Sequence, residues 1–154
     1  MKRFRFSLQS LLTLRQRREQ MALEHYGRSV SLRQQAVETL RVARTQWETV
    51  CRVRTTLLSK GAVAGELARA QAFCRATEES VAQCEQDVLR AQRGVEVSWQ
   101  KLLEARRARE VVDKYGQRQR ESYDRALQHE EQKMLDEMAQ RRLDNKAADL
   151  LHVD

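Results

Sequence analysis

The stretch LLSKGAVAGEL, residues 57–67, is the clearest interruption in a chain that otherwise carries helix-forming residues throughout. It holds two of the five glycines, and the 154 residues contain no proline. Gly61 can adopt the left-handed conformation that ends a helix, and Gly65 eases a restart just before Glu66 in a new first turn. The stretch therefore predicts that one long helix ends here and a second one folds back along it.

A single continuous helix is the alternative to this turn. It would hold both Gly61 and Gly65 in its interior, and each glycine would cost about 1 kcal/mol relative to alanine. An antiparallel hairpin, folded near residue 62 or 63, avoids this cost and is the favoured interpretation.

The composition is that of long helices rather than of a compact globular domain. Charged residues make up 33% of the chain and aromatic residues only 5%, which leaves little aromatic volume to fill a core. Disorder is a weaker alternative, because disordered chains are usually rich in proline and lack apolar periodicity. We predict an all-α fold in which two long helices form an antiparallel coiled-coil hairpin, the second helix longer than the first. Residues 1–154 would form this single hairpin, with a helix over about 7–58, a turn over about 59–65, a helix over about 66–145 and a frayed C-terminal tail.

Apolar and small residues recur at alternating steps of three and four on both sides of the turn. This spacing is typical of a coiled-coil seam, the line of residues that faces the partner helix. After the turn, only Thr77 and Arg109 among the predicted seam positions are neither apolar nor small. These positions are Leu67, Ala70, Cys74, Thr77, Val81, Cys84, Val88, Ala91, Val95, Ser98, Leu102, Ala105, Arg109 and Val112. Before the turn they are Leu23, Tyr26, Val30, Arg33, Val37, Leu40, Arg44, Trp47, Cys51, Arg54 and Leu58, with Ala36, Ala43, Val50 and Leu57 on one flank.

Folding the chain at the turn sets a register in which the numbers of facing residues sum to about 125. This register places Cys51 opposite Cys74 and Tyr26 opposite Trp99. It also leaves residues beyond about 118 without a partner helix, because the first helix is shorter.

The seam of the second helix is expected to end where its partner ends. Gly116 and Gln119 interrupt it, and a weaker, shifted stripe continues. This part of the helix would be exposed or bound to another molecule, and its stripe comprises Tyr123, Leu127, Met134, Leu135 and Met138.

Positive charge is concentrated in the first segment. Residues 1–60 hold 13 Lys or Arg against 4 Asp or Glu, whereas residues 61–154 hold 16 against 18. The register brings two distant arginine clusters together near the open end of the hairpin, where like charges repel and favour a partner that offers counter-charge. The alternative is that these arginines are helix formers on a solvated face, with Glu104 and Glu110 nearby. We call the set the basic collar: Arg15, Arg17, Arg18, Arg106, Arg107 and Arg109.

Two large aromatic residues lie near the turn and are candidates for contact with a partner. Trp47 occupies a seam position but is too large for small neighbours to cover, and Phe73 lies on the flank of the seam. Aromatic side chains that a thin two-helix rod cannot bury often serve as interface anchors. The alternative is that both simply pack along the seam.

The sequence gives no support for catalysis. It has no glycine-rich phosphate loop, no nucleophile elbow and no histidine-based metal motif, and its three histidines are isolated: His25, His129 and His152. A two-helix rod also lacks a concave pocket. We therefore expect a protein that is not an enzyme, with no cofactor, no metal and no small-molecule substrate.

The cysteines and the hydropathy bear on where the protein works. Cys51, Cys74 and Cys84 have no metal-like spacing and are interpreted as thiols in a reducing cytosol. No apolar run approaches the roughly 20 residues of a membrane-spanning helix. We expect a cytoplasmic protein.

Both ends of the chain carry residues that resemble a known family. The opening FRFSLQSLLTLRQRREQMA, residues 4–22, has an aromatic-x-Leu-x-x-Leu-Leu run followed by Arg and Glu. The tail QKMLDEMAQRR, residues 132–142, has a Lys-Met-Asp-Glu-like run before Gln and Arg. Together with the length and the glycine turn, these segments resemble the FliJ family of flagellar export proteins.

The resemblance implies a cytoplasmic stalk of the type III export apparatus, peripherally associated with the inner membrane. It implies that the end with both termini enters the pore of a hexameric flagellar export ATPase, where the basic collar would contact acidic or carbonyl groups. The turn side would face the export gate, a membrane protein with a large cytoplasmic domain, and export chaperones are further possible partners. Phe73 matches an aromatic that the family places on its gate-contacting surface, and with Trp47 it is the predicted gate contact. Thr77 and Cys84 depart from the residues expected on that surface.

Two alternative functions remain. The first is the equivalent stalk of a virulence type III secretion system, which shares the fold and the kinds of partner. The second, from another class, is a nucleic-acid-binding coiled coil in which the basic collar holds phosphates. No RNA-binding aromatic motif, zinc-finger spacing or helix-turn-helix signal is present, so no nucleic acid partner is expected.

Overall fold

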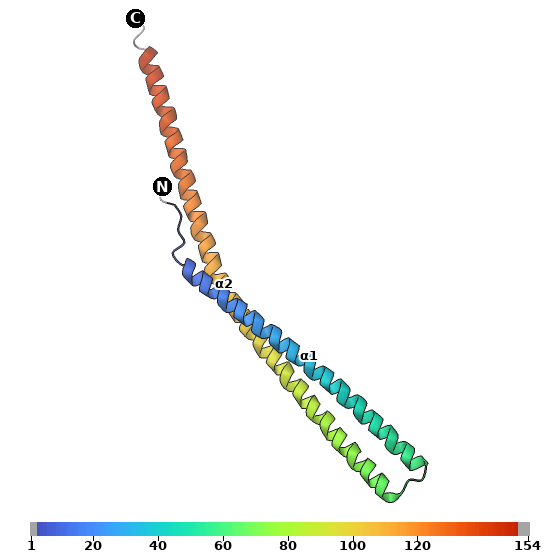
Figure 1. Ribbon diagram of the computed structural model, residues 1–154. Coiled ribbons are helices and arrows are strands. Elements are labelled where there is room, and N and C mark those ends of the chain that lie inside the picture. The colour runs from blue at the N-terminus through green and yellow to red at the C-terminus, as the bar shows by residue number, and fades with distance from the viewer. Residues whose placement is uncertain (1–2, 151–154) are drawn as a thin grey trace. The chain divides into compact units, whose positions relative to one another are not determined.

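The computed structural model describes residues 3–150, with side chains through residue 142. It contains two helices, α1 (Gln9–Ser59) and α2 (Ala64–Leu150), and the described residues include no strand (Figure 1). Helix α2 has 87 residues against 51 for α1, so the predicted all-α class with a longer second helix is confirmed. Helix α2 continues past its predicted end near residue 145, and the last four residues of the predicted frayed tail lie outside the described residues.

The turn between the helices is built around Gly61. Its φ of +72° lies in the left-handed region, which carries a steric cost for residues with a side chain. The Gly61 N–H donates to the Leu58 carbonyl at 3.3 Å, and the Ala62 N–H donates to the Leu57 carbonyl at 3.1 Å. This pair of bonds is the Schellman motif, which satisfies carbonyls at the end of α1. Gly61 therefore ends α1 as the sequence predicted.

We expect Gly61→Ala to lower the free energy of unfolding by about 1 kcal/mol, because alanine must adopt the left-handed conformation there. The matched control is Gly94→Ala in the interior of α2, where an added Cβ meets nothing within 4 Å. That change should raise the free energy by about 0.5–1 kcal/mol, because alanine has the higher helix propensity. Urea unfolding followed by circular dichroism measures both. Effects of the same sign would contradict this account of the turn.

Residues 17–106 form one compact unit, the antiparallel hairpin, in which α1 and α2 lie side by side (Figure 1). Four contacts between the two helices satisfy the predicted register. They are the Tyr26–Trp99 ring pair at 5.3 Å, Arg33 to Gln92 at 3.5 Å, Cys51 to Cys74 at 3.7 Å and Arg54 to Gln71 at 3.0 Å. The predicted pairing of the helices is therefore confirmed from the middle of α1 to the turn.

The core of the hairpin is thin and made largely of small side chains. Ala43, Cys74 and Leu102 are 8%, 4% and 8% exposed, and Ser98 is 1% exposed. The buried Ser98 hydroxyl donates to the Val95 carbonyl at 2.9 Å, so burying it leaves no unmade hydrogen bond. Small residues let the two helices approach closely. Each larger apolar side chain in the seam then contributes a large share of the buried apolar surface.

The structure confirms the predicted seam of α2 and corrects that of α1. Every predicted α2 position from Leu67 to Val112 is buried or half-buried. On α1, seven of the eleven predicted positions are half-buried, whereas the other four face solvent: Leu23, Val37, Arg44 and Leu58. The residues that take their place are smaller or lie on the flank: Ala22, Ser29, Ala36, Ala43, Val50 and Leu57. Close approach of the two helices favours the alanine flank of α1 at the contact. The Arg44 side chain lies on the surface, where its guanidinium is 2.7 Å from the Glu85 carboxylate.

A second compact unit comprises residues 1–16 and 107–154. Before α1 begins, residues 3–6 run without regular structure, and their aromatic rings pack on α2. Phe4 contacts Tyr123 with ring centroids 5.5 Å apart, and Phe6 contacts Tyr115 at 6.3 Å. A Cβ on Gly116 would lie 3.1 Å from the Phe6 ring, so the absence of a side chain there makes room for the aromatic ring.

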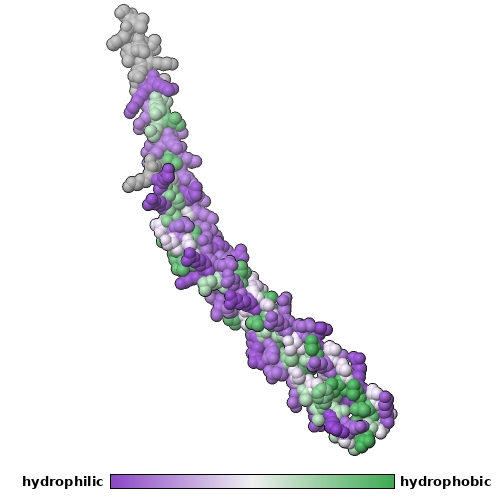
Figure 2. Space-filling model, in the orientation of Figure 1, coloured by the Kyte–Doolittle hydropathy of each residue, from purple (hydrophilic) through white to green (hydrophobic). Residues whose placement is uncertain are grey.

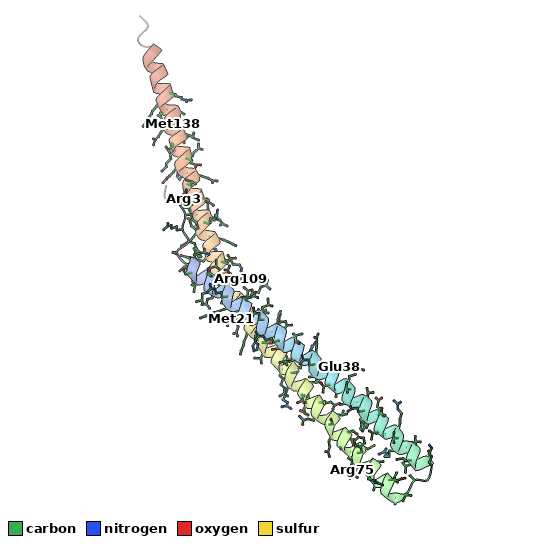
Figure 3. All side chains as sticks on the ribbon, viewed as in Figure 1. Arg3, Met21, Glu38, Arg75, Arg109 and Met138 are labelled. Atoms are coloured by element: carbon green, nitrogen blue, oxygen red, sulfur yellow. The ribbon has the colours of Figure 1, made fainter. Side chains whose placement is uncertain are left out.

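These contacts overturn the expectation that the seam ends near residue 116. Gly116, Gln119, Tyr123 and Leu127 are all half-buried and continue the spacing of three and four. The partner of α2 in this region is the N-terminal segment rather than a helix. Beyond it, Met134, Leu135 and Met138 are 60%, 61% and 56% exposed, as predicted for the continuing stripe. Figure 3 shows Met138 on a part of α2 that has no second helix beside it.

Candidate functional site

The six arginines of the basic collar are divided between the two units. Arg17, Arg18 and Arg106 belong to the hairpin, and all three are exposed. The register of the hairpin carries Arg17 and Arg18 of α1 to the level of Arg106 of α2, at the end away from the turn. These three guanidinium groups therefore concentrate positive charge at one end of the hairpin.

Arg15, Arg107 and Arg109 belong to the other unit. Arg107 is exposed, whereas Arg15 and Arg109 are half-buried. Arg109 lies 3.7 Å from Asp113 one turn along α2, so its charge is partly neutralised within the helix. The Arg15 Nε is buried and makes no hydrogen bond to the described residues. An unmade hydrogen bond of this kind costs free energy.

The side chain of Phe73 lines an open groove of about 500 Å³ in the turn half of the hairpin. Phe73 is 60% exposed, and Val42 and Val50 of α1 form the opposite apolar wall. Arg41 stands at the edge, where its guanidinium donates to Glu38 at 2.7 and 2.9 Å. Figure 2 shows apolar surface gathered around the turn end of the hairpin.

The groove is more apolar than its composition indicates, because its hydroxyl groups turn away from it. Thr45 donates to the Arg41 carbonyl at 3.0 Å, and Thr49 donates to the Thr45 carbonyl at 2.8 Å. Thr77 donates to the Phe73 carbonyl at 3.0 Å. Each threonine thus bonds to its own helix, which leaves its methyl group for the groove.

Trp47 lies in a different groove from Phe73. Its neighbours there are Arg44, Glu48, Glu78, Val81, Ala82 and Glu85, and the two grooves share no lining residue. Trp47 is half-buried beside the Arg44–Glu85 ion pair, which makes its surroundings the more highly charged of the two. The structure therefore does not bring the two predicted gate contacts together, and each must be considered separately.

The sequence interpretation missed the packing of the N-terminal aromatic residues. Phe4, Phe6, Tyr115 and Tyr123 form two ring pairs in the unit of residues 1–16 and 107–154. A signal was present, because Gly116 falls on the spacing of the seam and a glycine on a seam marks close approach of another group. It was interpreted as an interruption.

The remaining features of the described part of the chain are its metal-ligating side chains and its apolar segments. Among the described residues, there is no group of three or more His, Cys, Asp or Glu side chains that could hold a metal ion. The pKa of Glu38 is lowered, chiefly because Arg41 donates hydrogen bonds to its carboxylate, but this pair lies on the open surface. The described helices also contain no segment apolar and long enough to cross a bilayer.

Comparison with known proteins identifies the family. Residues 4–148 match the model of the family described as "Flagellar FliJ protein". Comparisons with curated proteins and with solved structures found no match. The family match includes both segments that the sequence singled out, the opening at residues 4–22 and the tail at 132–142. Because the match spans nearly all of a chain that folds as two unequal antiparallel helices, this protein belongs to the FliJ family.

Proposed function

We propose that this protein is the stalk of a flagellar type III export apparatus. In this role it catalyses no reaction. The end with both termini enters the pore of the hexameric export ATPase, and the turn half of the hairpin contacts the cytoplasmic domain of the export gate. The protein acts in the cytoplasm at the inner membrane, and export chaperones are further partners. The observation that carries the proposal is the match to a flagellar family over residues 4–148.

The geometry supports a mechanical role. The hairpin buries little core, and its surface presents long charged faces and open lateral grooves. Exposed arginines at the end of the hairpin away from the turn suit a ring lined by acidic side chains or carbonyl groups. The flagellar description of the family favours this system over a virulence secretion system.

The direct test mixes the purified protein with the purified export ATPase. We expect them to sediment together and the stalk to raise the rate of ATP hydrolysis. Absence of binding, combined with tight binding to DNA or RNA at physiological salt, would instead support a nucleic-acid-binding coiled coil. Recovery of the cargo proteins from the native cell separates a flagellar from a virulence system.

A second test concerns the gate. Phe73→Ala should weaken binding to the cytoplasmic domain of the gate about 10-fold or more, as expected for a buried aromatic anchor. Leu89→Ala is the matched control, because Leu89 is also an exposed apolar residue of α2, at 51% against 60%, and lines neither groove. Titration calorimetry measures both affinities. If both variants lost the same affinity for the gate, Phe73 would not be part of the proposed contact.

Trp47→Ala tests whether the gate also uses the second groove. If the gate covers both grooves, the loss from Trp47→Ala should add to that from Phe73→Ala in the double variant, because the two sites share no lining residue. An affinity equal to that of the Leu89→Ala control would confine the proposed contact to the Phe73 groove. Circular dichroism checks that the helices remain intact.

A further inference from the structure

Two cysteines face each other across the hairpin. The Cys51 sulfur on α1 lies 3.7 Å from the Cys74 sulfur on α2, and both residues are free thiols. Cys51 is half-buried, whereas Cys74 is only 4% exposed. Cys84, the third cysteine, lies ten residues further along α2 than Cys74, which is about 15 Å at 1.5 Å per residue.

We propose that Cys51 and Cys74 form a redox-responsive dithiol, a site at which a small disulfide such as oxidised glutathione converts the two thiols into a disulfide across the hairpin. The two sulfurs are in van der Waals contact and must close from 3.7 Å to the about 2.05 Å of a disulfide bond. A shift of this size is within the reach of side-chain rotation combined with a small approach of the helices.

The reaction proceeds by two thiol–disulfide exchanges. The Cys51 thiol loses its proton to solvent, and the thiolate attacks one sulfur of the small disulfide. A mixed disulfide forms on Cys51, and the first small thiolate leaves. The Cys74 thiol loses its proton in turn, and its thiolate attacks the Cys51 sulfur and displaces the second small thiolate. Each departing thiolate takes up a proton, so two protein thiols are oxidised and one small disulfide is reduced to two thiols.

The surroundings assign different roles to the two cysteines. Cys51 is the more exposed of the two and would react first with a small reagent, whereas Cys74 is shielded and would react only with its neighbour. Burial, followed by the hydrogen bond with Cys74, raises the pKa of the Cys51 thiol. The thiolate is the nucleophile, so the exchange should be slow at neutral pH and should accelerate as the pH rises.

The disulfide would tie together the two walls of the Phe73 groove. Val50 and Phe73, which lie on opposite walls, directly precede Cys51 and Cys74 in the sequence. In the reduced protein only noncovalent contacts hold the helices at this level, whereas the disulfide would fix their separation. Any effect on binding of the gate rests on the proposed function, but formation of the disulfide does not.

The test uses the full-length protein alone, without ATPase or gate. Incubation with oxidised glutathione should remove two hydrogens from the mass of the chain, and peptide mapping should join Cys51 to Cys74. Cys84→Ser should behave in the same way. Cys74→Ser should stop at a stable glutathione adduct on Cys51, whereas Cys51→Ser should leave Cys74 unmodified while the protein is folded.

The stability of the oxidised protein gives a second readout of the disulfide. The disulfide closes a loop of about two dozen residues, which should lower the unfolding equilibrium constant by roughly two orders of magnitude. Hydrogen exchange should slow around residues 45–80 and remain unchanged near residue 30, and dithiothreitol should reverse both effects. Crosslinked dimers, a bond involving Cys84, or thiols that stay reduced would each overturn the proposal. Because no partner is present, none of these outcomes depends on the export function.

Discussion

Leu102→Ala is expected to lower the free energy of unfolding by about 2–4 kcal/mol, the range for a buried leucine cut to alanine. Leu102 is 8% exposed and is the largest of the three buried apolar side chains that the hairpin buries, alongside Ala43 and Cys74. A core this thin has few neighbours that could close the cavity. Urea unfolding followed by circular dichroism at 222 nm gives the free energy.

Leu89→Ala is the matched control for this change. It makes the same substitution on the same helix at a position that is 51% exposed. Its effect should stay within about 0.5 kcal/mol, as for most surface changes. A comparable loss from both variants would mean that the helices of the hairpin do not pack along the observed seam.

Reversing the three exposed arginines of the hairpin should weaken binding to the ATPase ring about 10- to 100-fold at physiological salt. The variant is Arg17→Glu, Arg18→Glu and Arg106→Glu, and the measurement is ATPase affinity and stimulation at several salt concentrations. In the proposed contact, the arginines of the unmodified protein would attract acidic groups of the pore, whereas the glutamates would be repelled. The loss of affinity caused by the three substitutions should become smaller as the salt concentration rises, because salt screens the charges.

The control reverses Arg52, Arg69 and Arg75, which are also exposed but lie nearer the turn. It changes the net charge by the same amount, so a general effect of charge would weaken both variants equally. That result would contradict a localised contact with the ring. The other three collar residues are tested as Arg15→Gln, Arg107→Gln and Arg109→Gln, because two of them are half-buried and a buried glutamate would disturb the fold.

The basic collar shows which properties of a charged cluster can be predicted from the sequence and which cannot. The sequence selects the six arginines by their register, and the structure divides them between two units. It also shows that Arg109 pairs with Asp113 on its own helix. Burial and partners of this kind depend on side-chain directions, which the linear order of charges does not specify.

The aromatic candidates make the same point. Phe73 and Trp47 both lie near the turn in sequence, yet they line separate grooves. Successive residues of a helix differ by about 100° around its axis, so nearness to the turn in sequence does not decide which groove a side chain enters. The hydrogen bonds from the threonine hydroxyls to their own helices could not be predicted from the sequence either, because threonine counts there simply as a polar residue.

The sequence by itself determined the all-α class, the position of the turn, the unequal lengths of the helices and the register of their pairing. These follow from local features, namely a glycine that adopts positive φ and a repeat of about 3.5 residues on both sides of it. The glycine fixes where the chain folds and therefore which residues of the two repeats face each other. The tertiary structure decided how far the contact surface of α1 shifts toward its alanine flank and how the Phe6 ring packs on Gly116. Those outcomes depend on how closely the backbones approach, and that distance is set jointly by side chains far apart in the chain.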